Sequence, residues 1–203
     1  MADPTHTAFF YGTLMAPAVL HRVCDGTASH NDPTRRTTPF TTAPAILHDY
    51  RRHRVEGADY PAILPTSGAS VRGTYVTGLT EADMWRLDIF EGSDYERKFV
   101  KCKLLTEVGD EEGKGNVKGE EVEAETYVWV SEREDLEDRE WDFREFQREK
   151  LRFWAGTDDE YEEVDEAVAA AGKDGTGGRG ANGAITEALK EEQKKDEKLR
   201  NAV

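Results

Sequence analysis

Glu91 is the residue whose position in this sequence best suits acid–base chemistry. Ile89 and Phe90 precede it and Gly92 follows it. Apolar residues recur at three- and four-residue steps before Glu91, so we predict a helix over 80–91 that ends at the glycine. Burial beside apolar side chains and the negative end of the helix dipole both disfavour a charged carboxylate, so Glu91 should be harder to ionise than usual. Such a group can act as a general acid and base, whereas the alternative is a solvated glutamate at a helix end.

The start of this helix has its own signal, because Thr80 and Asp83 have the spacing of a capping pair. A broad apolar face follows, made of Met84, Trp85, Leu87, Ile89 and Phe90. Such a face packs against the rest of the molecule, and it therefore positions the carboxyl group at the helix end.

A second candidate lies near the start of the chain, where a β-prone run leads into Tyr11-Gly12-Thr13-Leu14-Met15. Gly12 has no Cβ atom, so a ligand can come close to its backbone. We predict that Thr13 caps a short helix here, which leaves the amides of Gly12 to Met15 without helical partners. Amides grouped in this way bind a carboxylate or a developing oxyanion. Turns from a strand into a helix are common, so the prediction depends on pairing this turn with Glu91.

Other catalytic chemistries find no matching motif in the sequence. The five histidines are scattered, and none has a metal-ligand spacing to another histidine, a cysteine or a carboxylate. No serine lies in a nucleophile-elbow pattern and no phosphate-binding loop is present. Cys24 and Cys102 are far apart and should be free thiols in a reducing compartment, with Cys102 on the inward face of a strand. We therefore expect neither a metal nor a cofactor.

The formal net charge of −15 argues against a nucleic acid or an anionic membrane as the main partner. No segment approaches the roughly 20 apolar residues of a membrane span, and the N-terminus does not resemble a secretory signal. We expect a soluble, cytoplasmic protein. Its sequence identifies no protein partner.

Arg51-Arg52-His53-Arg54 is the one dense basic cluster in the part of the sequence that should fold. It fits an exposed strand or turn. Alternatively, it provides a local positive potential that draws an acidic substrate to the site.

The predicted elements indicate an α+β fold, because strands outnumber helices and the two do not alternate regularly. Strands are expected over 7–11, 45–47, 60–65, 71–79, 99–104 and 122–130, with an acidic glycine-rich loop over 107–121. The helices are expected over 13–20, 80–91, 131–156 and 157–172; the third opens with a capping box over 131–134 and has a candidate break near Trp141-Asp142. We predict a folded domain over 1–171. Six glycines fall within 172–183 and a charged segment follows, so 172–203 should be a linker and a disordered tail.

Several motifs in order resemble the gamma-glutamylcyclotransferase family, and in particular its plant avirulence-induced-gene-like branch, which includes gamma-glutamylamine cyclotransferase-like proteins. The similarity covers roughly residues 7–155. It is carried by Phe10-Tyr11-Gly12-Thr13-Leu14-Met15, Tyr60-Pro61-Ala62-Ile63-Leu64-Pro65, Val71-Arg72-Gly73, Leu87-Asp88-Ile89-Phe90-Glu91-Gly92, Tyr95-x-Arg97, Tyr127-Val128-Trp129 and Trp141-Asp142-Phe143.

The resemblance implies a small mixed β-barrel with peripheral helices and a cavity floored by the turn at Gly12. It implies that Glu91 is the acid–base group and that a small γ-glutamyl compound is the substrate. The α-amine of the γ-glutamyl group would attack its own γ-carbonyl and release 5-oxoproline and a free amine or amino acid. Tyr11 and Tyr95 would shape the pocket or donate a hydroxyl hydrogen bond, although both also suit a core position. Asp88 suits a structural hydrogen bond.

A second function remains open at this point. The same cavity could serve a non-catalytic small-molecule-binding module or a stress-response interaction protein. Ligand binding without turnover would separate this function from the enzymatic one.

Overall fold

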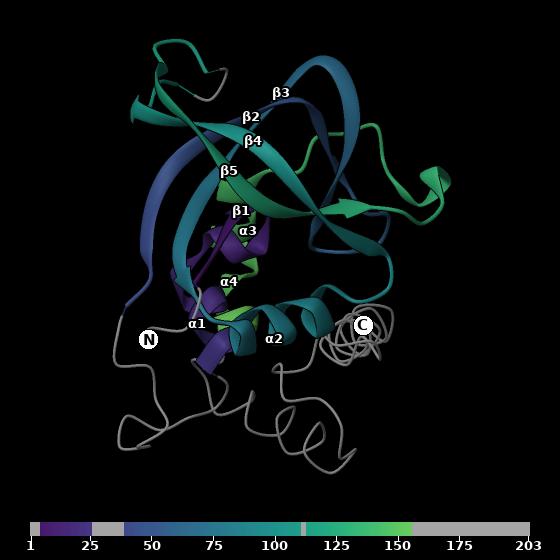
Figure 1. Ribbon diagram of the computed structural model, residues 1–203. Coiled ribbons are helices and arrows are strands. Elements are labelled where there is room, and N and C mark those ends of the chain that lie inside the picture. The colour runs from purple at the N-terminus through teal and green to yellow at the C-terminus, as the bar shows by residue number, and fades with distance from the viewer. Residues whose placement is uncertain (1–4, 26–38, 111–112, 156–203) are drawn as a thin grey trace, which may run out of the picture.

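The computed structural model describes residues 5–25, 39–110 and 113–155 of the chain. In chain order the elements are β1 (His6–Phe10), the 3-10 helix η1 (Thr13–Met15), α1 (Pro17–Asp25), β2 (Thr41–Arg54), β3 (Pro61–Leu79), α2 (Glu81–Glu91), β4 (Tyr95–Glu107), β5 (Val117–Trp129), the 3-10 helix η2 (Arg133–Asp135), α3 (Phe143–Glu149) and α4 (Leu151–Ala155) (Figure 1). The α+β class is therefore confirmed. The helix predicted over 157–172 and the tail predicted over 172–203 lie outside the described residues.

The strands follow the order β1-β3-β2-β4-β5, and β1 also pairs with β5, so the sheet closes on itself as a barrel. The pairing of β1 with β5 is parallel and joins Ala8 to Glu125, whereas the other neighbouring strands are antiparallel. Figure 1 shows α1, α2 and α4 together below the curved strands. None of the helices in the described ranges is long and apolar enough to cross a membrane.

The strand predicted over 60–65 and the one predicted over 71–79 are a single strand of 19 residues, β3. The gap expected between these two strands is a bulge in β3: His48 pairs with Ser70 and Tyr50 with Pro65, so residues 66–69 of β3 lie opposite the single residue Asp49 of β2. Asp49 adopts a φ of 61° at this bulge, and its Oδ1 accepts a hydrogen bond from the amide of Gly68 at 2.9 Å. The side chain thus bridges the irregularity and the two strands continue past it.

Other boundaries also differ from the prediction. β2 runs over Thr41–Arg54 where 45–47 was predicted, and β4 over Tyr95–Glu107 where 99–104 was predicted. β5 begins at Val117, so the glycine-rich loop is shorter than expected. The capping box predicted over 131–134 is wrong, because the Ser131 hydroxyl donates to Asp94 Oδ1 at 2.7 Å. The cap of α3 is Asp142 instead, whose side chain accepts hydrogen bonds from the backbone amides of the first helical turn.

The helix that carries Glu91 matches its prediction closely. The side chains and amides of Thr80 and Asp83 bond to each other as a reciprocal capping box, and Gly92 ends the helix with a φ of 75°. Met84, Leu87 and Phe90 are buried. Trp85 was predicted on the same apolar face, but its side chain points to solvent and is 60% exposed. The buried face is therefore a narrower stripe than expected.

Two apolar clusters form the core. One fills the barrel, around Phe9, Leu47 and Val128, and the other lies between the barrel and the helices, around Phe90 and Trp154. Both cysteines are buried and neither forms a disulfide, and Cys102 faces the interior of the barrel as predicted. Burial raises the pKa of the Cys102 thiol to about 11, so this thiol stays protonated near neutral pH and is a poor nucleophile.

Gly73 permits the closest approach of β1 to β3. A Cβ atom at this position would collide with the carbonyl oxygen of Phe10 and come within 2.6 Å of the Phe9 ring. Because the oxygen belongs to the backbone, it cannot move aside without disturbing β1. The small size of this residue therefore fixes where β1 ends and where the turn at Gly12 begins.

We predict that Gly73→Ala lowers the free energy of unfolding by about 1–3 kcal/mol or more, the usual cost of overpacking a core. Urea denaturation measures the loss. Gly119→Ala in β5 is the matched control, because the nearest atom to its new methyl group is a side-chain methyl carbon of Thr106 at 3.2 Å, which can adjust. Equal stability of the two variants would contradict the close approach at Gly73.

Candidate active site

Glu91 and the turn at Gly12 line the same hollow. Its empty space is about 290 Å³, part of which is open to solvent. Five segments contribute to the wall: the end of β1, η1, the start of β3, the end of α2 and the end of β5. The lining residues are Phe9, Phe10, Tyr11, Gly12, Thr13, Leu14, Tyr60, Pro61, Glu91 and Tyr127. The structure thus places a carboxyl group beside a backbone turn that lies far from it in the sequence.

Glu91 is the last residue of α2, as predicted, and its side chain is half-buried. The amide of Gly92 donates to the carbonyl oxygen of Asp88 at 3.1 Å and closes the last helical turn. The left-handed conformation of Gly92 then directs the chain away into β4, so that the helix ends at the wall of the hollow.

The turn itself differs in detail from the prediction. Gly12, not Thr13, is the residue that precedes the helical turn, and Thr13 is buried. Gly12 has an extended φ of −125°, so no left-handed backbone demands a glycine here. Its Cβ would instead lie 2.8 Å from Cγ of Pro61. The missing side chain therefore lets the turn pack against Pro61, and the close approach of a ligand to Gly12 stays a prediction.

Two of the predicted binding residues lie outside the lining. Met15 donates its amide to the carbonyl oxygen of Gly12 at 3.0 Å, so this amide is used within the turn. Tyr95 is buried and its hydroxyl donates to the carbonyl oxygen of Pro61 at 2.9 Å. Tyr95 thus supports a residue of the wall from behind. Gly12, Thr13 and Leu14 remain as the turn residues that line the hollow.

Tyr11 is a core tyrosine that also lines the hollow. Its hydroxyl donates to the carbonyl oxygen of Tyr127 at 2.6 Å in the interior. This contact ties the end of β1 to β5.

Tyr127 belongs to one of the family motifs but was not among the predicted site residues, and it lines the hollow. Its hydroxyl donates to Asp88 Oδ1 at 2.8 Å, which ties β5 to α2. Burial raises the pKa of Tyr127, and the nearby carboxyl groups of Asp88 and Glu91 raise it further, so the phenol stays protonated near neutral pH. The alternation over 122–130 placed Tyr127 and Trp129 on one face of the strand, but alternation alone does not say which face meets a cavity.

Behind Tyr127 a chain of charged groups continues to the surface. Asp88 pairs with Nε of Arg97 at 3.2 Å, and Arg97 also pairs with Glu125 at 3.1 Å. Glu125 then contacts Nδ1 of His6 at 2.8 Å, a hydrogen bond that raises the pKa of His6 against the opposing effect of burial. The prediction that Asp88 has a structural role fits this position. The chain joins α2, β4, β5 and β1 around the site.

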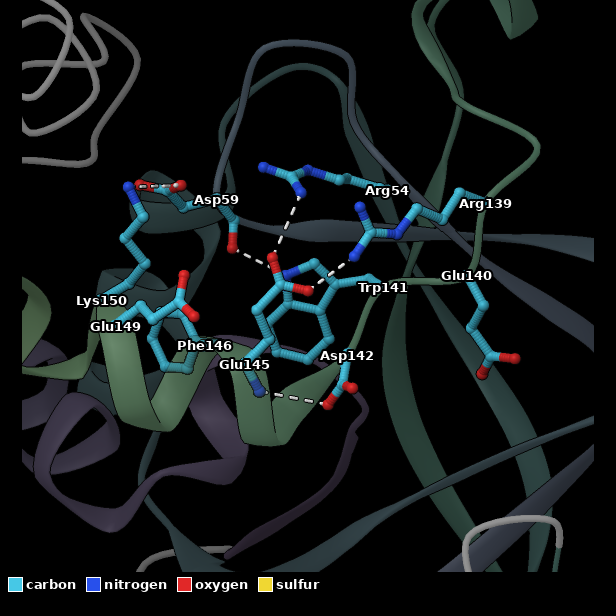
Figure 2. Close-up of a pocket in the computed structure, with 10 residues that line it drawn as sticks. All are labelled: Arg54, Asp59, Arg139, Glu140, Trp141, Asp142, Glu145, Phe146, Glu149 and Lys150. Carbon is cyan, nitrogen blue, oxygen red and sulfur yellow. Dashed lines mark hydrogen bonds and ion pairs between the residues drawn. The ribbon is translucent and has the colours of Figure 1, made fainter. Parts of the chain in front are cut away.

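A second hollow, of about 320 Å³, lies between the end of β2 and α3 (Figure 2). Its charged groups bind one another. Glu145 pairs with Arg139 at 2.6 Å and with Arg54 at 3.7 Å, and Lys150 pairs with Asp59 at 3.4 Å. These ion pairs connect α3 to the barrel, so we assign these charged groups a structural role.

Residues 8–143 match the family described as gamma-glutamyl cyclotransferase, AIG2-like, and the chain belongs to this family, as the motifs indicated. The chain is 34% identical to Protein AIG2 C of Arabidopsis thaliana over 146 residues, 71% of this chain and 74% of that protein. It is 32% identical to AIG2-like protein D of the same plant over 143 residues, 70% and 80% of the two chains. A solution structure of an Arabidopsis thaliana protein is similar at a TM-score of 0.50 and 25% identity, covering 86% of this chain and 97% of that one.

We predict that Tyr95→Phe lowers the free energy of unfolding by about 1–3 kcal/mol, because the Pro61 carbonyl loses its buried donor. Thermal or urea denaturation measures the loss. Tyr75→Phe in β3 is the control, since the Tyr75 hydroxyl makes no hydrogen bond with any residue that the structure describes. A Tyr95→Phe variant no less stable than Tyr75→Phe would mean that the bond to Pro61 contributes nothing.

Proposed function

We propose that this protein is a gamma-glutamylcyclotransferase that converts a small γ-glutamyl compound to 5-oxoproline and a free amine or amino acid. The observation that carries the proposal is the shared hollow of Glu91 and the turn at Gly12. Membership of the gamma-glutamyl cyclotransferase, AIG2-like family supports the same class of reaction. Neither the attached amine nor the reaction product follows from family membership, so both belong to the proposal.

The reaction suits a site with one acid–base group. The nucleophile is the α-amine of the substrate, so the enzyme supplies no nucleophile of its own. Glu91 accepts a proton from the α-ammonium, and the amine nitrogen then attacks the γ-carbonyl carbon and forms a five-membered ring. The protonated Glu91 returns the proton to the leaving nitrogen as the bond between the γ-carbon and this nitrogen breaks. Holding the substrate in a folded conformation removes much of the barrier, because ring closure is intramolecular.

The remaining lining groups match the charges of a γ-glutamyl group. The backbone of Gly12, Thr13 and Leu14 offers amides to the α-carboxylate or to the oxyanion that develops on the γ-carbonyl. The Tyr127 hydroxyl donates its proton to Asp88, so its oxygen has lone pairs left to accept a hydrogen bond. Such an acceptor suits the α-ammonium. Phe9, Phe10 and Tyr60 complete the wall and exclude water from one side.

Glu91→Gln should lower the rate of 5-oxoproline formation by about 10²–10⁴-fold, the usual contribution of a general acid–base group. The substitution keeps the size of the side chain, so the melting temperature should stay near that of the wild type. The assay follows 5-oxoproline from a panel of γ-glutamyl dipeptides and γ-glutamyl amines. Glu96→Gln is the control, because Glu96 is exposed on β4 and pairs with Lys98.

Three results of that assay would change the conclusion. Full activity of Glu91→Gln would remove Glu91 from the mechanism. Free glutamate as the product would indicate hydrolysis. Binding of these compounds without turnover by the wild type would favour the non-catalytic binding module.

Tyr127→Phe should lower kcat/KM by roughly 10- to 100-fold, which corresponds to the loss of a hydrogen bond to a charged group. Tyr95→Phe is the matched control, because it removes the hydroxyl of another buried tyrosine that is not among the residues lining the hollow. Similar catalytic losses in the two variants would assign the effect to stability and exclude a specific role for the Tyr127 hydroxyl.

A further inference from the structure

We propose that Arg52 is a positioning residue of this site, which fixes the turn at Gly12 and supplies the positive charge that makes the hollow selective for a ligand with an ionised carboxylate. The inference adds a side chain from outside the lining. It rests on the proposed function only in the choice of ligand.

The first observation is the contact between Arg52 and the turn. Nη1 of Arg52 donates to the carbonyl oxygen of Tyr11 at 2.9 Å. This oxygen belongs to the peptide unit whose N–H is that of Gly12, a residue of the wall. A cation that binds the carbonyl end of a peptide polarises the whole unit and makes its N–H a stronger donor. Arg52 therefore acts on the hollow through one peptide bond.

The second observation is the charge of the wall. Of the residues that line the hollow within the described ranges, none is lysine, arginine or histidine, and Glu91 is the one carboxylic acid. Asp88 adds a further carboxyl group behind Tyr127, and its cationic partner Arg97 is shared with Glu125. An anionic ligand would meet repulsion from these groups. A cation that contacts the turn from behind offsets this repulsion.

The third observation is how Arg52 is held. Its side chain is only 13% exposed, and its guanidinium lies 5.5 Å from the ring centroid of Trp141. Nη2 binds Glu140 at 3.1 Å, but Glu140 is 61% exposed, so solvent screens much of that negative charge. Burial lowers the pKa of Arg52 and Glu140 opposes this effect, yet an arginine remains charged near neutral pH. A fixed, buried cation thus stands behind the turn.

The competing explanation is that Arg52 only fastens the segment around Trp141 to the barrel. A structural role alone would weaken every ligand to a similar extent. A role in charge recognition would weaken ligands with a carboxylate more than neutral ones. The ratio of the two affinities therefore separates the explanations.

The experiment measures binding of two ligands to the full chain by titration: 5-oxoproline and its neutral carboxamide. Wild-type protein should prefer the acid by about tenfold or more, the size of effect expected for a charged hydrogen bond. Arg52→Met should abolish this preference, and Arg52→Lys should restore part of it because the charge remains. Arg51→Met is the control, since Arg51 is exposed and donates to the carbonyl oxygen of Asp138. Its preference should equal that of the wild type.

Absence of a preference for the acid in the wild-type protein would overturn the inference without any variant, so a failure of Arg52→Met to fold does not protect it. An unchanged preference in Arg52→Met would overturn it as well. Turnover of γ-glutamyl compounds is measured separately. A preference for the acid that depends on Arg52, without turnover, supports the inference and contradicts the proposed enzyme. Turnover without such a preference supports the proposed enzyme and contradicts the inference about Arg52.

Discussion

Tyr127 holds the two halves of the site together. Its carbonyl oxygen accepts the hydroxyl hydrogen bond of Tyr11 at 2.6 Å, which fixes the end of β1, and its hydroxyl binds Asp88 at 2.8 Å, which fixes the end of α2. Asp88 lies one helical turn before Glu91, so the second bond also sets the position of the carboxyl group. The first bond is buried and the second is partly buried, and a buried bond is costly to leave unmade. The distance between turn and carboxyl group thus depends on one residue of β5.

Closure of the sheet makes this arrangement possible. β1 has only five residues, yet it pairs with β3 on one side and with β5 on the other, so its end is held between two long strands. The close approach at Gly73 and the packing of Gly12 on Pro61 then leave the turn little freedom. A rigid backbone is what a site needs when its donors are peptide amides, because no side-chain rotation can correct a misplaced turn.

Local signals in the sequence predicted α2 well, since its cap, its buried stripe and its glycine end all depend on neighbouring residues. They also predicted that the helix ends at Glu91 and that the chain turns at Gly12. The family similarity predicted that the two positions share a cavity. Longer-range features were missed. The continuity of β3 depends on a bulge that places residues 66–69 opposite Asp49 of β2, and the orientation of Tyr127 depends on which face of β5 turns inward. Arg52 is buried although it belongs to a basic cluster, because its guanidinium binds the carbonyl oxygen of Tyr11. No local sequence pattern indicates that this carbonyl lies nearby.

The most direct test of this account is the location of bound 5-oxoproline, followed by amide chemical-shift changes in isotope-labelled protein. The account predicts that the largest changes fall on Gly12, Thr13 and Leu14 and on the end of α2 at Glu91, with smaller changes at Tyr127. Changes that gather instead around Glu145 and Lys150, or amides at Gly12 to Leu14 that do not respond at saturating ligand, would contradict it.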